Sequence, residues 1–261
     1  MRAHHQRVVQ RLVDQFQDDP RFPAMIVGGS VAKGWARDDS DVDVMLVATG
    51  EEFRRRLATG ELGYVTTEPA DYPGGYVDGK IVDVAFLREA ANRGSEPARA
   101  AFLDAIVAYS RVPDLEALLA RIPVYPEHER DAKMRAFASH LALLHWYVGE
   151  ADKRQDPYLL SWTAANLVLY GGRLVLAHNR LLYPFHKWFM RQLRLAPDKP
   201  ANMVELADAV LRHPSRETAL RFFECVHSFR DWGVPLSRAG VDFMLETEWS
   251  WRGGRPPLAE W

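Results

Sequence analysis

The sequence contains one cysteine, Cys225, in 261 residues. A single thiol cannot form a disulfide within the chain, and it cannot supply a zinc site built from several thiolates. Phe222, Phe223 and Val226 surround Cys225 in the sequence. This apolar setting predicts a buried small hydrophobic residue.

Long apolar runs and an excess of positive charge are also missing. No run approaches the about 18 apolar residues of a membrane helix, and the N-terminal segment lacks the apolar stretch of a secretory signal. We therefore expect a cytoplasmic protein with no membrane partner. The 33 Lys and Arg are balanced by 35 Asp and Glu, giving a net charge of −2. This balance of charge disfavours a nucleic-acid partner.

The length and the hydropathy pattern indicate two domains, at residues 1–122 and 123–261. The chain is 48% hydrophobic and 26% charged, which is the composition of a globular protein. In the first half, strand-like runs occur at 24–27, 41–47 and 106–109, and Asp78-Gly79 indicates a hairpin turn between two runs within 76–84. Helical periodicity marks residues 8–16, 51–57 and 115–120.

Beyond Pro123 and Pro126 the apolar periodicity becomes helical, which predicts a helical bundle. We expect helices at about 128–150, 157–180, 185–194, 201–212, 216–230 and 235–248, several of them beginning at a proline. The final residues, 249–261, contain three tryptophans and two adjacent prolines. They predict an irregular tail packed through its aromatic side chains.

The residues that carry chemistry lie close together near the N-terminus. Gly28-Gly29-Ser30 follows the first strand-like run, and glycines there let the backbone approach a ligand closely. A helix that opens just after Ser30 directs backbone N–H groups at an anion, which predicts a phosphate site. Asp41 and Asp43 are two residues apart on the next strand, so both project from one face while Val42 enters the core.

Two adjacent carboxylates repel each other unless a cation lies between them, and Mg²⁺ is the usual cation beside phosphates. A third carboxylate, Asp83, lies within an apolar run of the predicted hairpin and needs a partner, such as a second metal or the proton of an attacking hydroxyl. Asp78 is the competing residue, but the hairpin turn accounts for it. Together these residues predict metal-assisted phosphoryl or nucleotidyl transfer.

Gly29-Ser30, ten intervening residues, Asp41-Val42-Asp43 and a later Asp83 resemble the nucleotidyltransferase superfamily of the DNA polymerase β type. The version Gly-Ser-x-Ala-Lys-Gly followed by Ser-Asp-x-Asp is similar to the minimal and the aminoglycoside and lincosamide nucleotidyltransferases. The resemblance covers about the first 90 residues. It implies an α+β fold, with a small mixed β-sheet and flanking helices followed by an all-α helical domain that closes the cleft.

The resemblance also implies residue roles. Gly29 and Ser30 would bind the β and γ phosphates, Asp41 and Asp43 would hold two Mg²⁺ ions, and Asp83 would complete the second metal site and serve as general base. Lys33, one helical turn after Ser30, is a further nucleotide-binding candidate, with an exposed helix lysine as the alternative. In the second half we select Lys187 for the triphosphate, with Arg180 or Arg173 as substitutes and a solvated lysine as the alternative.

The expected activity is transfer of a nucleoside monophosphate, AMP from ATP, to a hydroxyl of a small-molecule acceptor such as an antibiotic or a sugar-like compound, with release of pyrophosphate. Nucleotidylation of a protein partner and a regulatory nucleotide-binding module are the alternatives. The residues leave the acceptor and the oligomeric state open.

Residues 1–122 contain 15 basic and 19 acidic side chains, and residues 123–261 contain 18 and 16. A triphosphate held between an acidic, metal-binding half and a basic half is consistent with those opposite signs.

Overall fold

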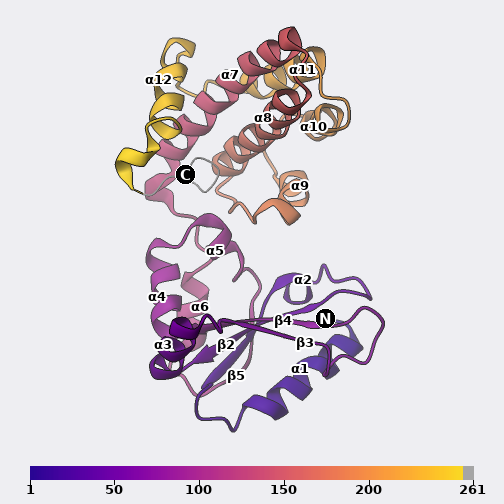
Figure 1. Ribbon diagram of the computed structural model, residues 1–261, viewed down its shortest axis with the longest axis vertical. Coiled ribbons are helices and arrows are strands. Elements are labelled where there is room, and N and C mark those ends of the chain that lie inside the picture. Colours follow the sequence, from indigo (N-terminus) through magenta and orange to yellow (C-terminus); the bar gives the residue numbers. More distant parts are fainter. Residues whose placement is uncertain (255–261) are drawn as a thin grey trace. The chain divides into compact units, whose positions relative to one another are not determined.

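Five strands form a single sheet in the computed structural model, which describes residues 1–254 (Figure 1). They are β1 (Ala24–Val27), β2 (Val42–Ala48), β3 (Gly63–Thr66), β4 (Val77–Asp83) and β5 (Ile106–Ser110), in the order β3-β4-β2-β1-β5. Strands β2 and β4 are parallel and the other pairs are antiparallel. The sheet is therefore mixed, and the predicted α+β class is confirmed.

Helices cover the two faces of this sheet. Helix α1 (Ala3–Phe16) packs Val8 and Leu12 against Val42, Val44 and other residues of one face. Two helices, α4 (Val84–Arg93) and α6 (Leu115–Arg121), pack on the other face, and the short α5 (Glu96–Ala100) follows α4. All four residues of β1 are buried because its alternating side chains enter both layers. Two further helices, α2 (Gly29–Ala32) and α3 (Gly50–Thr59), connect strands.

The predicted hairpin at residues 76–84 is wrong. Strand β4 runs without a turn through Asp78-Gly79 and pairs with β2 in parallel and with β3 in antiparallel register. Gly79 lies opposite Tyr64 of β3, and a Cβ at position 79 would lie 2.7 Å from the Tyr64 carbonyl oxygen. Its glycine thus permits a close approach of two strands and does not make a turn.

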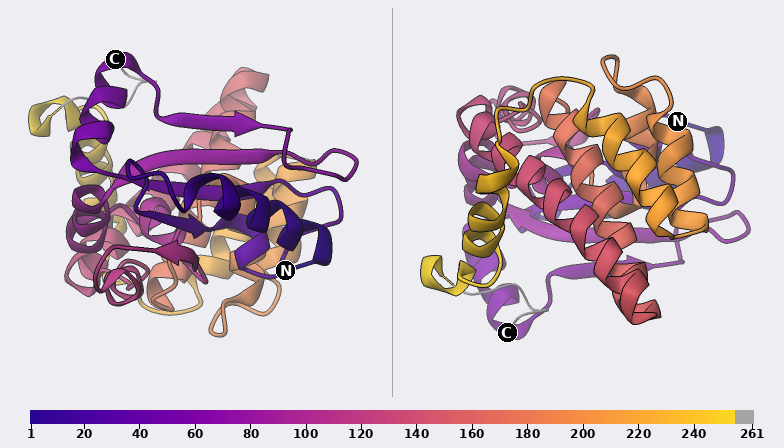
Figure 2. Two further views of the ribbon diagram at one scale, coloured as in Figure 1. Left: turned by 90° about the horizontal axis from the view of Figure 1, so that it is seen from below. Right: turned by 90° about the horizontal axis from the view of Figure 1, so that it is seen from above.

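The chain divides into two compact units, Met1–Val124 and a second unit that begins at Tyr125. The described part of the second unit is helical, with α7 (Arg130–Arg154), α8 (Pro157–His178), α9 (His186–Leu195), α10 (Met203–Arg212), α11 (Arg216–His227) and α12 (Leu236–Glu246), and short 3₁₀ turns η1 (Glu127–Glu129) and η2 (Ser250–Gly253). The right-hand view of Figure 2 shows its long helices running side by side. The predicted helical bundle is confirmed.

Helix α8 corrects the expectation that no segment has the length and composition of a membrane span. Within residues 1–254 it is the one helix that is long and apolar enough by those two measures. Ten of its 22 residues are buried in the second unit. A Cβ on Gly171 would lie 2.7 Å from the Phe222 ring, and one on Gly172 would lie 2.2 Å from the Phe189 ring. This helix is therefore closely packed against α11 and α9.

The remaining expectations for the second unit hold in part. Cys225 is half-buried and packs against the hydrophobic core, and burial raises the pKa of its thiol. Trp249 and Trp251 are exposed rather than packed, and a 3₁₀ turn forms at Ser250–Gly253. The rest of the predicted tail, 255–261, lies outside the described residues.

Candidate active site

Asp41, Asp43 and Asp78 come together at one end of the paired strands β2 and β4. Asp43 lies directly opposite Asp78 in the parallel register. Each of the three side chains offers a carboxylate oxygen, and these oxygens all lie within 4.8 Å of one another. As predicted, Val42 and Val44 are buried in the core beneath α1, so the aspartates project from the opposite face. Strands β2 and β4 thus fix Asp43 and Asp78, and Asp41 lies just before the start of β2.

Asp83, the sequence-based choice for the third carboxylate, does not belong to this cluster. It pairs with Ala48 at the other end of β4, five residues from Asp78, which is about 16 Å along a strand. The Asp83 carboxylate caps helix α4 by accepting a hydrogen bond from the Phe86 N–H at 2.7 Å. The third carboxylate of the cluster is instead Asp78, which the sequence pattern had assigned to a hairpin turn.

The glycine turn lies directly against the carboxylate cluster. Gly29 has a φ of +61°, and a Cβ there would lie 1.6 Å from Oδ2 of Asp43, so only glycine fits. The Gly28 N–H donates to the Asp43 carbonyl oxygen at 3.0 Å. Ser30 is buried within α2, which begins at Gly29 and has only one turn. The turn and the first carboxylate pair therefore form one rigid arrangement.

Tyr76 contacts the cluster, and sequence reasoning missed it. Its hydroxyl donates to Oδ2 of Asp41 at 3.1 Å. This hydrogen bond and the negative charge of Asp41 raise the pKa of the tyrosine hydroxyl. Tyr76 immediately precedes β4, so the pairing of that strand with β2 brings it to Asp41. No local spacing in the sequence indicates such a contact.

Lys33 is anchored beside the same turn. Its ammonium group donates to the Ala100 carbonyl oxygen at 3.1 Å and lies 5.8 Å from the centre of the Trp35 ring. Burial lowers the pKa of Lys33, and the negative charges of Asp104 and Asp43 partly oppose that shift. Lys33 is therefore a half-buried cation within electrostatic range of the cluster, and not the exposed helix lysine of the alternative interpretation.

The basic candidates of the second unit differ in how strongly they are engaged. Lys187 is exposed in the first turn of α9, with its ammonium group 5.6 Å from the centre of the Trp188 ring. Arg180 makes two hydrogen bonds of 2.8 Å to the carboxylate of Glu127. The Arg173 guanidinium lies 4.4 Å from the Phe137 ring centre and 4.6 Å from that of Tyr183. A role for Lys187 in nucleotide binding stays a prediction.

The donor set of the cluster suits a hard divalent cation. Three carboxylates supply only oxygen ligands, which Mg²⁺ and Mn²⁺ prefer, and Mg²⁺ usually completes its shell with water and substrate phosphates. Without a cation, three negative charges at this separation repel one another. Asp41, Asp43 and Asp78 are therefore the residues that fit a metal in this unit.

The comparisons with known proteins include a structural likeness. No family model matches the chain, and no curated protein matches it. The fold is similar to the crystal structure of a nucleotidyltransferase-like protein from Exiguobacterium sibiricum 255-15, with a TM-score of 0.48 and 13% sequence identity over 98% of this chain and 83% of that chain.

Proposed function

We propose that this protein is a Mg²⁺-dependent nucleotidyltransferase that transfers AMP from ATP to a hydroxyl group of a small-molecule acceptor and releases pyrophosphate. One observation carries the proposal: three carboxylates, two on paired strands and one just before β2, bring an oxygen each within 4.8 Å of one another, and a glycine of positive φ lies against one of them. Carboxylates that hold a cation beside a turn open to phosphate are what in-line nucleotidyl transfer requires.

Asp41, Asp43 and Asp78 would hold the cations, two ions being the number proposed. When bound, Mg²⁺ neutralises charge on the triphosphate and on the departing pyrophosphate. The absence of a side chain at Gly29 lets the Asp43 carboxylate lie against the turn, where the phosphates would bind, and Ser30 of the same turn would supply a hydroxyl. Lys33 adds a positive charge that is already held in place by the Ala100 carbonyl, so little side-chain entropy is lost on binding.

In the reaction, the acceptor oxygen forms a bond to the α-phosphorus of ATP, and the bond from that phosphorus to the oxygen bridging to the β-phosphorus breaks. Pyrophosphate leaves with the bonding electron pair. The acceptor hydroxyl loses its proton to the carboxylate of Asp78. Tyr76 holds the Asp41 carboxylate by its hydrogen bond at 3.1 Å and thereby keeps that ligand in one orientation.

The test measures cation binding and turnover in the same variants. Electron paramagnetic resonance measures the binding of Mn²⁺ in the presence of ATP, and this assay needs no acceptor. Pyrophosphate release is then measured over a panel of hydroxyl compounds. Asp43→Asn should lose both signals. Asp39→Asn is the matched control, because Asp39 lies in the loop just before β2 but pairs with Arg37 at 3.0 Å. Normal turnover in Asp43→Asn, or the same loss in Asp39→Asn, would refute the proposal.

A further inference from the structure

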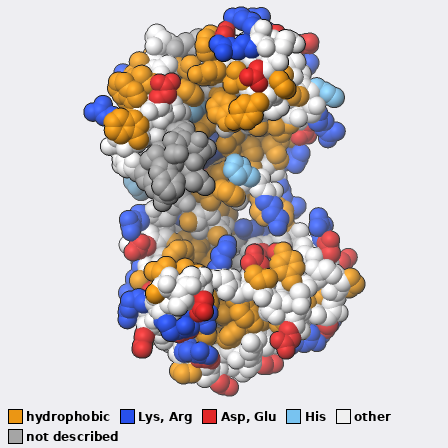
Figure 3. Space-filling model, viewed as in Figure 1, with side chains coloured by type: hydrophobic (Ala, Val, Ile, Leu, Met, Phe, Trp, Pro, Cys, Tyr) orange, Lys and Arg blue, Asp and Glu red, His pale blue; other side chains and the backbone are white. Residues whose placement is uncertain are grey.

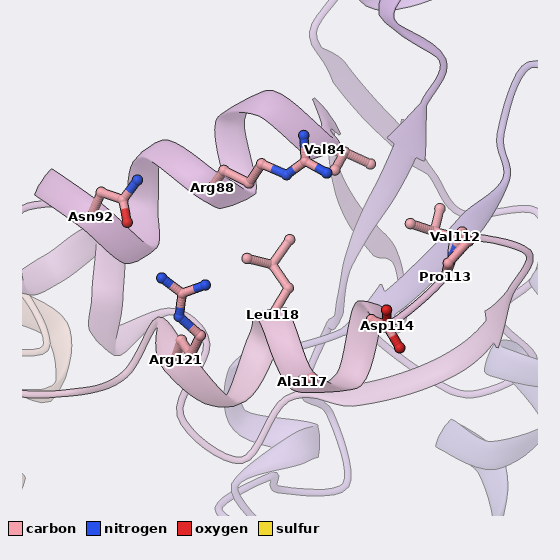
Figure 4. A pocket seen from close by; sticks show the side chains of 9 residues that line it. All are labelled: Val84, Arg88, Asn92, Val112, Pro113, Asp114, Ala117, Leu118 and Arg121. Carbon is pink, nitrogen blue, oxygen red and sulfur yellow. The ribbon is translucent and has the colours of Figure 1, made fainter.

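A cavity of about 510 Å³ lies between helices α4 and α6, away from the carboxylate cluster (Figure 4). It begins at Val84, the residue after Asp83, and therefore lies at the end of β4 opposite to Asp78. Its remaining lining residues are Arg88, Asn92, Val112, Pro113, Asp114, Ala117, Leu118 and Arg121. The activity proposed above uses none of these residues.

The polar side chains that line this cavity are not engaged elsewhere. Within residues 1–254, the structure gives no hydrogen bond or ion pair to the side chains of Arg88, Asn92, Asp114 or Arg121. Asp114 occupies the N-cap position of α6 but makes no capping hydrogen bond. Arg93, also on α4, is by contrast paired with Glu89 at 2.7 Å. Polar groups gathered without partners around one cavity are available to a ligand.

The arrangement of these groups defines the chemistry of the ligand. Figure 4 shows Leu118 at the centre of the cavity, with Arg121 on one side and Arg88 across from it on α4. Asp114 lies with Val112 and Pro113 at one end. Two guanidinium groups suit a phosphate, the side chains of Leu118 and Val112 suit an apolar body, and the Asp114 carboxylate accepts a hydrogen bond.

We propose that this cavity binds a small organic phosphate: a phosphomonoester whose phosphate lies between Arg88 and Arg121, whose apolar body covers Leu118, and whose hydrogen-bond donor reaches Asp114. The volume of about 510 Å³ is within the range of small-molecule sites. This site does not depend on the proposed nucleotidyl transfer, because its residues are separate from the three metal-binding aspartates.

The probe is 4-aminophenyl phosphate, which carries a phosphate, an aromatic body and an amine donor at the far end. Its affinity for the full chain is measured by isothermal titration calorimetry in EDTA, so that no cation links it to the aspartates. Inorganic phosphate, which lacks the apolar body, should bind at least about tenfold more weakly. 4-Aminobenzoate, which replaces the phosphate by a carboxylate, should also bind more weakly, and equal affinity would refute the assignment to phosphate.

Variants locate the binding site. Arg88→Gln and Arg121→Gln should each weaken binding by at least about fivefold, and the double variant should abolish it, because each removes a charge-assisted hydrogen bond. Arg93→Gln is the control on the same helix and should bind like the wild type. Ala117→Glu, which adds a carboxylate to the exposed wall, should weaken binding without removing any group. Asp43→Asn should leave the affinity unchanged.

Two outcomes with the variants overturn the proposal. One is unchanged affinity in the Arg88→Gln, Arg121→Gln double variant, and the other is an equal loss in Arg93→Gln, which would mean that surface charge alone attracts the probe. Both arginines are exposed, so their replacement should leave the circular dichroism spectrum and the unfolding midpoint in place. Absence of any binding of the probe to the wild type also rejects the site.

Discussion

Replacing Asp78 and Asp83 should change activity and stability in opposite ways. In the metal-free protein, Asp78 adds repulsion with two carboxylates whose oxygens lie within 4.8 Å. Two unit charges at that separation in water repel by about 0.9 kcal/mol. Asp78→Asn should therefore raise the free energy of unfolding in EDTA by on the order of 1 kcal/mol. Asp83→Ala should lower it by about 1 kcal/mol, because the cap on the Phe86 N–H is lost.

Turnover should be lost when Asp78 is replaced and kept when Asp83 is replaced. Losing a metal-binding carboxylate removes several kcal/mol of transition-state stabilisation, and about 4 kcal/mol corresponds to roughly a 10³-fold fall in rate. Asp78→Asn should therefore be almost inactive although its metal-free form is more stable. Asp83→Ala should keep its turnover, and Asp83→Asn should keep both turnover and stability because Asn also caps helices well.

The assays are urea unfolding in EDTA and pyrophosphate release with Mg²⁺ and ATP. The slope of the unfolding free energy against urea should be the same in all variants, so that the midpoints report stability alone. Added salt should shrink the gain in Asp78→Asn, since it screens repulsion between half-exposed charges. If Asp83→Asn loses turnover to the extent that Asp78→Asn does, the assignment of the third carboxylate is wrong.

Three further predictions concern other residues. Gly29→Ala should abolish Mn²⁺ binding, because the new Cβ would lie 1.6 Å from a carboxylate oxygen of Asp43. Gly34 has a similar positive φ but open space around it, so Gly34→Ala should lower the free energy of unfolding by only about 1–2 kcal/mol. Tyr76→Phe should weaken Mn²⁺ binding by about 10- to 100-fold, as titration by electron paramagnetic resonance will show. Burial lowers the pKa of His140, so the unfolded chain binds more protons and the free energy of unfolding should fall as pH drops below 6.5. Urea unfolding from pH 7 to 5.5 should show a smaller fall in His140→Phe than in the wild type; equal falls in the two proteins would contradict this.

The sequence predicted the parts of the site that depend on local pattern. The run 24–27, the glycine turn and the alternation around Asp41 and Asp43 each depend on neighbours a few residues away, and the structure contains β1, α2 and β2 there. The helices of the second unit were likewise visible because an amphipathic or buried helix repeats its apolar positions over many residues.

The third carboxylate depended on strand pairing, which local pattern does not contain. An Asp-Gly pair between two strand-like runs reads the same in a hairpin turn and in a continuous strand, and only the opposing Tyr64 of β3 distinguishes the two. Strand β3 escaped notice because it has four residues, lies at the sheet edge and exposes Val65. Asp83 could have been recognised as a helix cap, since Leu87 and Ala90 follow it at helical spacing and are both buried.

Because Asp43 lies opposite Asp78 in the parallel pairing, the carboxylate cluster forms only when strands β2 and β4 are aligned in this register. A slip of one residue would bring Gly79 or Val77 opposite Asp43 and turn the third carboxylate toward the helix on the far side. At the proposed metal site, cation affinity is therefore expected to depend on the alignment of β2 with β4, and a cation titration should follow that alignment during refolding. Selection for the reaction and selection for the correct topology act here on the same row of backbone hydrogen bonds.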